Sequence, residues 1–299
     1  MKSRVFVSFN AGEGRQGRHT MEHILEMSRC SELLPAEPPV IAGKQSWIFG
    51  QTLDADDPRL IRLRSALQQK GVRRFERREN QYDESEIRSA PLLHFVVTTA
   101  PRQFGGPQCG TAYDLSQACP ACGTDSTQVS ALMAKASQLP KRALICQTLD
   151  HEYLVSADLE QSLRKSGISG LELRQVRSHK DQALLPWWQM IALTTMPRMA
   201  ASTRGVIRGS PAPCPRCSRD GFFMTVTEPE EIVYNASEVD IERLPDCVQT
   251  WECFGKSGVK EPFHLSHFAR PLMLVKPKVY EILCSVEVRG IEYIPVQVR

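Results

Sequence analysis

The sequence has no apolar run as long as a membrane-spanning helix needs, because Arg, Lys or Pro interrupts each candidate within a few residues. Its first ten residues are too short in apolar length for a signal peptide and lack a small-residue cleavage site. We therefore expect a cytoplasmic protein with no membrane partner. In that compartment the ten cysteines are expected to be reduced or metal-bound rather than joined in disulfides.

The sequence also has little excess charge of either sign. Its 37 basic and 34 acidic residues leave a net charge of +3, which is too balanced to indicate nucleic-acid binding by charge alone. No Ser/His/Asp arrangement, paired-carboxylate site or phosphate loop occurs with the flanking sequence that such sites require. We therefore predict that the protein is not an enzyme.

Four cysteines form two Cys-x-x-Cys pairs, Cys119 with Cys122 and Cys214 with Cys217. Two such pairs supply four thiolates, the complete tetrahedral shell of one structural zinc ion. A compact zinc ribbon separates its pairs by about 15–20 residues, whereas 91 residues (123 to 213) separate them here. One shared zinc would therefore close a long loop. Its role would be architectural, with no coordination position open to a substrate.

The cysteine pattern leaves other states open. The alternatives to one structural zinc are two independent redox dithiols, reduced thiols that bind no metal, and two metals that use additional ligands. The candidate additional ligands are Cys109, Cys146, His264 and His267, although both histidines are expected at the edge of the core. The other cysteines have no paired spacing and are expected to be small core residues: Cys30, Cys247, Cys253 and Cys284.

A change in composition near Gly105-Gly106-Pro107 divides the chain into two parts. We expect an N-terminal α/β segment of unknown role at 1–104 and a double Cys-x-x-Cys zinc domain at 105–299. The length and the hydrophobic fraction of 41% are sufficient for two ordinary domains or one large one.

Local patterns predict the elements of the first part. Strands are expected at 4–9 and 92–98, and a helix at 19–27. A second helix is predicted to begin at Asp57-Pro58, because an acidic cap and an early proline are typical of helix starts. It is expected to end near Gly71 and to bury one face that carries Leu60, Leu63 and Leu67.

The second part contains an internal repeat. Residues 154–176 and 274–296 align without a gap at an offset of 120, with six identities in 23 positions. Each copy predicts a short strand ending in Leu-Val, a helix, and a second strand opened by Gly, an apolar residue and Glu. Each copy also follows its own cysteine pair. The predicted fold class is therefore α+β, with a zinc-ribbon-stapled domain built on two repeated strand-helix-strand units.

Together with both cysteine pairs, the unit at 154–172 and the closing segment 271–296 resemble the bacterial double-CxxCG-motif family over roughly 105–299. Some members of that family are described as immunity proteins that protect a cell from toxins delivered by its neighbours. The resemblance implies a non-catalytic, zinc-stabilised protein that binds a toxin or effector. This chain departs from the motif at Ser218, which stands where the second glycine is expected. The alternative is a zinc-ribbon nucleic-acid-binding or regulatory protein.

Two motifs near the N-terminus imitate functional sites. The glycines of Gly12-Glu-Gly14-Arg-Gln-Gly17 lie between a predicted strand and a predicted helix, as in a dinucleotide-binding turn. No strand ending in an acid clearly follows at the required distance, so we expect a flexible turn, with a looser anion site as the functional alternative. His19-Thr-Met-Glu22-His23 fits a zinc-peptidase pattern, but it needs a third ligand that the sequence does not indicate.

Three further features have ordinary structural interpretations. The arginines around Phe75 are diluted by acidic residues, and we expect a solvated helix end or linker rather than a nucleic-acid contact. Of Trp187 and Trp188, one is expected in the core and the other on a binding surface. The acidic run at 228–234 is expected to be ordinary surface.

Overall fold

The structure is a computed structural model of the chain, and it describes all residues except 37–39, 42–43, 99–104, 210–213 and 256–268. The described chain forms two compact units. Unit 1 comprises residues 1–83 and 225–229, and unit 2 comprises 84–224 and 230–299. Both units mix helices with strands, which confirms the α+β class. No helix among the described residues has the length and apolar character needed to cross a membrane.

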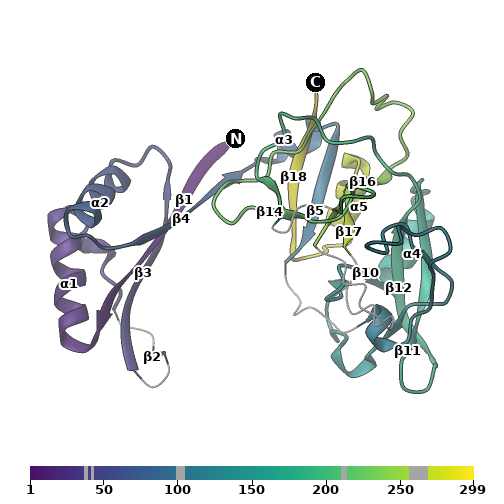
Figure 1. The fold of residues 1–299 in the computed structure, drawn as a ribbon, viewed down its shortest axis with the longest axis horizontal. Helices are drawn as coiled ribbons and strands as arrows, with labels where there is room; N and C mark the ends of the chain where they lie inside the picture. The colour runs from purple at the N-terminus through teal and green to yellow at the C-terminus, as the bar shows by residue number, and fades with distance from the viewer. Residues whose placement is uncertain (37–39, 42–43, 99–104, 210–213, 256–268) are drawn as a thin grey trace. The chain divides into compact units, whose positions relative to one another are not determined.

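Unit 1 is an antiparallel sheet with two helices against one face (Figure 1). Its elements are β1 (Lys2–Glu13), α1 (Gly14–Met27), the 3-10 helix η1 (Ser31–Leu33), β2 (Val40–Ile41), β3 (Lys44–Asp54), α2 (Pro58–Gln69) and β4 (Arg74–Gln81). The strand order is β2-β3-β1-β4. This is the βαββαβ arrangement, in which each helix connects two strands that are not neighbours in the sheet.

The core of unit 1 follows from alternation along β1. Val5, Val7 and Phe9 point toward the helices and are buried. The predicted second helix is confirmed as α2, and the Asp57 side chain caps it by accepting a hydrogen bond from the Arg59 amide at 2.8 Å. Leu60, Leu63 and Leu67 are all buried, as their helical spacing predicts.

One prediction for the first hundred residues is wrong, and one predicted strand belongs to unit 2. The stretch around Phe75 is neither a helix end nor a linker, because it forms β4 and pairs antiparallel with β1. The strand predicted at 92–98 exists as β5 (Leu92–Val97), but it pairs with β17 and β18 inside unit 2. Local sequence patterns do not show which distant strands pair, because the unpaired backbone groups at a strand edge can hydrogen-bond to a strand from any part of the chain.

Unit 2 contains two larger sheets and a two-stranded ribbon. Its strands are β5, β6 (Tyr113–Asp114), β7 (Thr127–Gln128), β8 (Met133–Ala134), β9 (Ile145–Gln147), β10 (Tyr153–Ser156), β11 (Leu171–Ser178), β12 (Leu184–Ala192), β13 (Val206–Arg208), β14 (Phe222–Met224), β15 (Val233–Tyr234), β16 (Cys247–Phe254), β17 (Arg270–Val275) and β18 (Ile291–Val298). Its helices are α3 (Glu84–Ser89), η2 (Gly106–Cys109), η3 (Ala136–Gln138), α4 (Ala157–Lys165) and α5 (Pro277–Ser285). The sheet orders are β8-β11-β12-β10-β9 and β13-β14-β16-β17-β5-β18-β15.

The two segments at the offset of 120 form the same elements in the same order. Helices α4 and α5 begin and end at corresponding positions, and so do strands β11 and β18. The identical glycines Gly170 and Gly290 precede these strands with left-handed φ angles of 75° and 78°. That region of conformational space is one that glycine occupies without steric cost, which accounts for the identity.

The sheet positions also correspond, although the connections differ. The order β9-β10-β12-β11 in one sheet matches β16-β17-β5-β18 in the other, and every neighbouring pair is antiparallel. Strand β12 follows β11 directly, whereas its counterpart β5 comes from far upstream. One core cluster joins the two sheets and receives side chains from both α4 and α5.

Candidate metal centre

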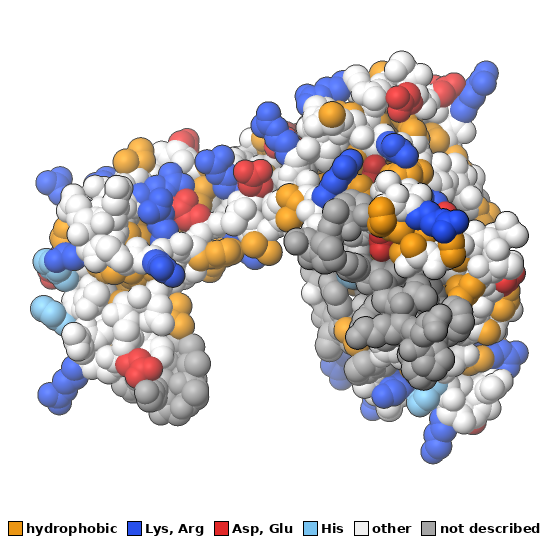
Figure 2. All heavy atoms as spheres, in the orientation of Figure 1, with side chains coloured by type: hydrophobic (Ala, Val, Ile, Leu, Met, Phe, Trp, Pro, Cys, Tyr) orange, Lys and Arg blue, Asp and Glu red, His pale blue; other side chains and the backbone are white. Residues whose placement is uncertain are grey.

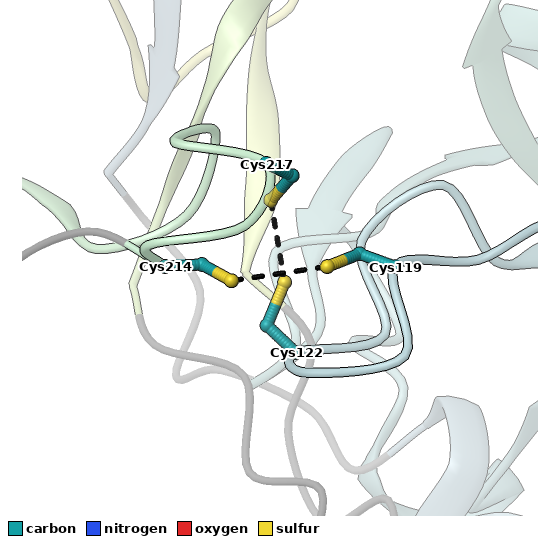
Figure 3. Close-up of side chains that lie close together, drawn as sticks. All are labelled: Cys119, Cys122, Cys214 and Cys217. Carbon is teal, nitrogen blue, oxygen red and sulfur yellow. Dashed lines mark hydrogen bonds between the residues drawn. The ribbon is translucent and has the colours of Figure 1, made fainter.

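The sulfur atoms of Cys119, Cys122, Cys214 and Cys217 converge on one point from two loops (Figure 3). All four sulfurs lie within 4.8 Å of one another. Two of the sulfur pairs join the two loops, with 3.8 Å between the Cys119 and Cys214 sulfurs and 3.5 Å between those of Cys122 and Cys217. A tetrahedral zinc at about 2.3 Å from each thiolate would separate the sulfurs by about 3.8 Å. The cluster therefore has the dimensions of a four-thiolate metal site and can hold a metal ion.

The same distances exclude disulfides in this structure. A disulfide requires about 2.05 Å between sulfurs, and all ten cysteines are free thiols. The two Cys-x-x-Cys pairs form one cluster rather than two separate dithiols. Its loops come from distant parts of unit 2: the first lies between β6 and β7, and the second between β13 and β14.

Backbone hydrogen bonds shape both loops into the same turn. In the first loop the Gly123 amide donates to the Cys119 carbonyl at 2.7 Å, and in the second the Ser218 amide donates to the Cys214 carbonyl at 2.8 Å. The Cys214 amide donates to the Asp220 carboxylate at 2.8 Å, which fixes the start of the second turn. These bonds direct the cysteine side chains toward a common centre.

Ser218 adopts the backbone conformation that the motif reserves for glycine. Its φ angle is 59°, close to the 76° of Gly123 at the equivalent position of the first turn. A residue with a Cβ atom is strained in this left-handed region. The departure from the motif therefore changes the energy of the second turn and leaves its shape intact.

We expect the Ser218→Gly variant to raise the free energy of unfolding by about 1 kcal/mol, because glycine adopts this φ angle without steric strain. Thermal unfolding of the metal-loaded variant measures the change. Gly123→Ala is the matched reverse substitution and should destabilise by a similar amount. An unfolding midpoint that falls in Ser218→Gly would contradict the strain interpretation.

Burial and hydrogen bonding act on the thiols in opposite directions. Burial raises the pKa of the Cys122 thiol and of the Cys217 thiol. Burial also opposes ionisation of Cys214, but the amides of Cys217 and Arg216 point at its sulfur and bring its pKa below the usual value. Four adjacent thiolates repel one another, so a bound cation is what allows all four to ionise together.

The other candidate ligands do not join the cluster. Cys109 and Cys146 are buried elsewhere in unit 2, and burial raises the pKa of Cys146 to about 12. His264 and His267 lie outside the described residues. Three of the four cysteines predicted as core residues are buried, namely Cys30, Cys247 and Cys253. The prediction for Cys284 is wrong, because its side chain is exposed on α5.

The two N-terminal motifs have structural explanations. Rings His19 and His23 stack on α1 with centroids 6.5 Å apart, and Glu22 pairs with Arg18. Among the described residues, the four cysteines are the only cluster of His, Cys, Asp and Glu side chains that could hold a metal ion. The glycine turn is not a dinucleotide site, because β1 pairs antiparallel with both neighbours, whereas that site needs a parallel βαβ unit. A Cβ atom on Gly17 would lie 2.4 Å from the Gly12 carbonyl oxygen, so glycine serves close packing here.

Both tryptophans of β12 pack against core clusters from opposite faces. Trp187 is buried in one cluster, and Trp188 lies partly buried against another. The run at 228–234 is not ordinary surface, because Ile232, Val233 and Tyr234 are buried. Within it, Glu230 lies 2.6 Å from the His94 ring in the interior of unit 2.

The sequence patterns did not predict a buried polar network that lies beside the candidate metal centre. The Arg270 guanidinium pairs with the Glu152 carboxylate at 2.6 Å and donates to the Tyr113 hydroxyl at 2.9 Å. The Gln189 amide donates to the same carboxylate at 2.7 Å. These side chains line a cavity of about 470 Å³ that the first cysteine loop also borders. No local motif connects these four positions, since only the packing of the two sheets brings them together.

Comparison with known proteins finds no match among protein-family models, curated proteins or solved structures. The function of this site is therefore inferred from its own residues and their geometry.

Proposed function

We propose that this is a non-catalytic, zinc-stabilised cytoplasmic protein that binds and neutralises a bacterial toxin or effector. The observation that carries the proposal is the four-sulfur cluster of Cys119, Cys122, Cys214 and Cys217. Four thiolates in a tetrahedral arrangement favour zinc among the ions of the cytoplasm. A zinc with four protein ligands has no position for water or substrate, so it serves structure rather than catalysis.

The arrangement of the two strand-helix-strand units supports an architectural metal. We take the two strand-helix-strand segments of unit 2, at 154–176 and 274–296, as repeats, because their helices, strands and sheet orders correspond at the offset of 120. The first cysteine loop precedes the repeat at 154–176, and the second loop precedes the repeat at 274–296. A shared zinc joins segments that are 91 residues apart (123 to 213) in the chain. The surface around the loops is then rigid, which reduces the entropy lost when a partner binds.

A specific observation favours the alternative, a nucleic-acid-binding protein. On the sheet face of unit 1 opposite the helices, Phe75 of β4 is 41% exposed. Phe6 of β1 shares that face, and the Arg77 guanidinium lies 5.5 Å from its ring centroid. Exposed aromatic and basic side chains on a four-stranded sheet are a known way to stack single-stranded bases.

The experiment that separates these functions is capture of partners from bacterial cells with tagged, zinc-loaded protein, using Cys214→Ser as the matched control. We expect a protein that only the wild type retains. Expressed alone, this partner should arrest growth, and co-expression of the wild-type chain should restore it. A retained partner without toxicity would refute the immunity role. Retention of nucleic acid with a steep salt dependence would favour the alternative.

A further inference from the structure

The 38 residues from 182 to 219 contain no Asp or Glu but carry five arginines: Arg198, Arg204, Arg208, Arg216 and Arg219. Arg219 pairs with Asp125. The other four form no ion pair with any carboxylate in the described part of the chain. Elsewhere in unit 2, arginines are commonly paired, as Arg88 is with Glu84. On the face of unit 2 in Figure 2, Lys and Arg side chains lie among hydrophobic ones.

Two of these unpaired arginines lie at a hollow of about 240 Å³ beside the second cysteine loop. The end of the seven-stranded sheet forms part of its wall, through β13, β14 and β16, and residues 198–201, Thr203 and Ser218 complete it. Glu252 of β16 also lines the hollow, but its carboxylate is buried and accepts a hydrogen bond from the Met199 amide at 2.9 Å. The Arg198 guanidinium lies 4.2 Å from the centroid of the Trp251 ring, and the Arg208 guanidinium lies 5.9 Å from that of Phe222. Stacking on a ring orients the planar guanidinium and leaves its N–H edge available for a carboxylate.

Strand β13 ends the sheet and offers a second recognition element. Among the described residues it pairs with β14 alone, so one side of its backbone has no strand partner. Ile207 of β13 and Phe223 of β14 are opposite each other in register, and their side chains are 50% and 38% exposed. Because side chains alternate along a strand, Arg208 points to the other face from Ile207.

We propose that this arginine surface, made of Arg198, Arg208, Ile207 and Phe223, binds an extended acidic segment of a protein partner along the edge of β13. Such a segment adds a strand by main-chain hydrogen bonds, and its alternate side chains reach opposite faces. Acidic side chains would pair with the two guanidinium groups, and apolar ones would contact Ile207 and Phe223. The proposal rests on the protein-binding function proposed above and assigns the surface that performs it.

The geometry favours a protein segment over nucleic acid. Guanidinium groups already cover the Trp251 ring, since Arg198 and Arg219 lie 4.2 and 5.4 Å from its centroid. A covered ring is not available to stack a base. Exposed apolar side chains next to arginines are typical of protein-binding hot spots.

The test is fluorescence anisotropy with the full-length, zinc-loaded protein and a labelled peptide of alternating Glu and Val. We expect saturable binding by the wild type and by Arg243→Gln, a control that removes an exposed arginine from unit 2. The Arg198→Gln/Arg208→Gln variant should bind at least about tenfold more weakly, as expected for the loss of two charge pairs. A peptide of alternating Lys and Val should not bind the wild type.

A charge-reversal variant distinguishes the loss of charge pairs from misfolding of the double variant. Arg208→Glu should lose the Glu-Val peptide and gain affinity for the Lys-Val peptide, which an unfolded chain would not do. Failure of the wild type to bind the Glu-Val peptide, or equal affinity in the double variant, would overturn the surface assignment. So would displacement of the peptide by oligo(dT) with the same arginine dependence. If partner capture still succeeded, the assignment would fail while the proposed function stood.

Discussion

Replacing Cys119 or Cys214 by serine is expected to release the metal from both cysteine pairs at once. One sulfur from each loop lies within 3.8 Å of a sulfur from the other, so each pair supplies only half of the coordination shell. We expect one zinc per chain in the wild type and loss of zinc in both variants. Structural zinc binding is worth about 10–16 kcal/mol in zinc-finger peptides, so unfolding midpoints should fall by more than about 10 °C.

Elemental analysis of purified protein, together with thermal unfolding, measures both effects. Cys284→Ser is the matched control, because it makes the same chemical change at an exposed cysteine outside the cluster. It should keep the metal and the unfolding midpoint. Two zincs per chain, each sensitive to one pair only, would contradict the shared site. An unchanged fold with no zinc would contradict the metal-centred proposal.

The second large effect is expected at the buried ion pair between Arg270 and Glu152. Arg270→Met removes the cation and leaves the Glu152 carboxylate without its charged partner in a largely buried position. Breaking one side of a buried pair costs about 3–5 kcal/mol, because the remaining charge stays desolvated. Urea unfolding of the variant should show a loss of this size.

A double variant distinguishes the orphaned charge from lost packing. Arg270→Met/Glu152→Leu removes both charges, and we expect it to recover most of the lost stability. Arg243→Met, at a side chain that is 89% exposed, should change the free energy of unfolding by less than about 0.5 kcal/mol. If the double variant were no more stable than Arg270→Met, charge burial would not be the cause.

Local chemistry accounts for the parts of the structure that the sequence predicted well. Helix α2 begins at Pro58 because Asp57 and Pro58 supply the cap and the fixed φ angle that a first turn needs. Helix α4 follows Ser156, whose hydroxyl accepts a hydrogen bond from the Leu159 amide at 3.4 Å. The tight Cys-x-x-Cys turns are local in the same sense, because each is held by hydrogen bonds among its own residues.

Strand pairing accounts for the parts that were missed. Nothing within β5 indicates that it lies between β17 and β18 rather than in the N-terminal segment. The segment around Phe75 was predicted to be a helix end or linker, because a strand that is largely exposed contains few apolar residues. The pairing of Glu230 with His94 likewise depends on a buried position that an acidic run does not predict.

The sequence by itself determined the starts of α2, α4 and α5, the apolar face of α2, the tight cysteine turns and the four thiols available to a metal. These features depend on residues within a few positions of one another. The start of α1 was missed, because that helix begins at Gly14 rather than at His19. The tertiary structure decided that the four sulfurs meet, that β5 completes the sheet of unit 2, and that Arg198 and Arg208 lie over aromatic rings and form no ion pair with the described carboxylates. These outcomes depend on which strands pair across long stretches of chain. Strand pairing depends on the total apolar area that complete sheet faces bury, and no short segment of sequence determines that area.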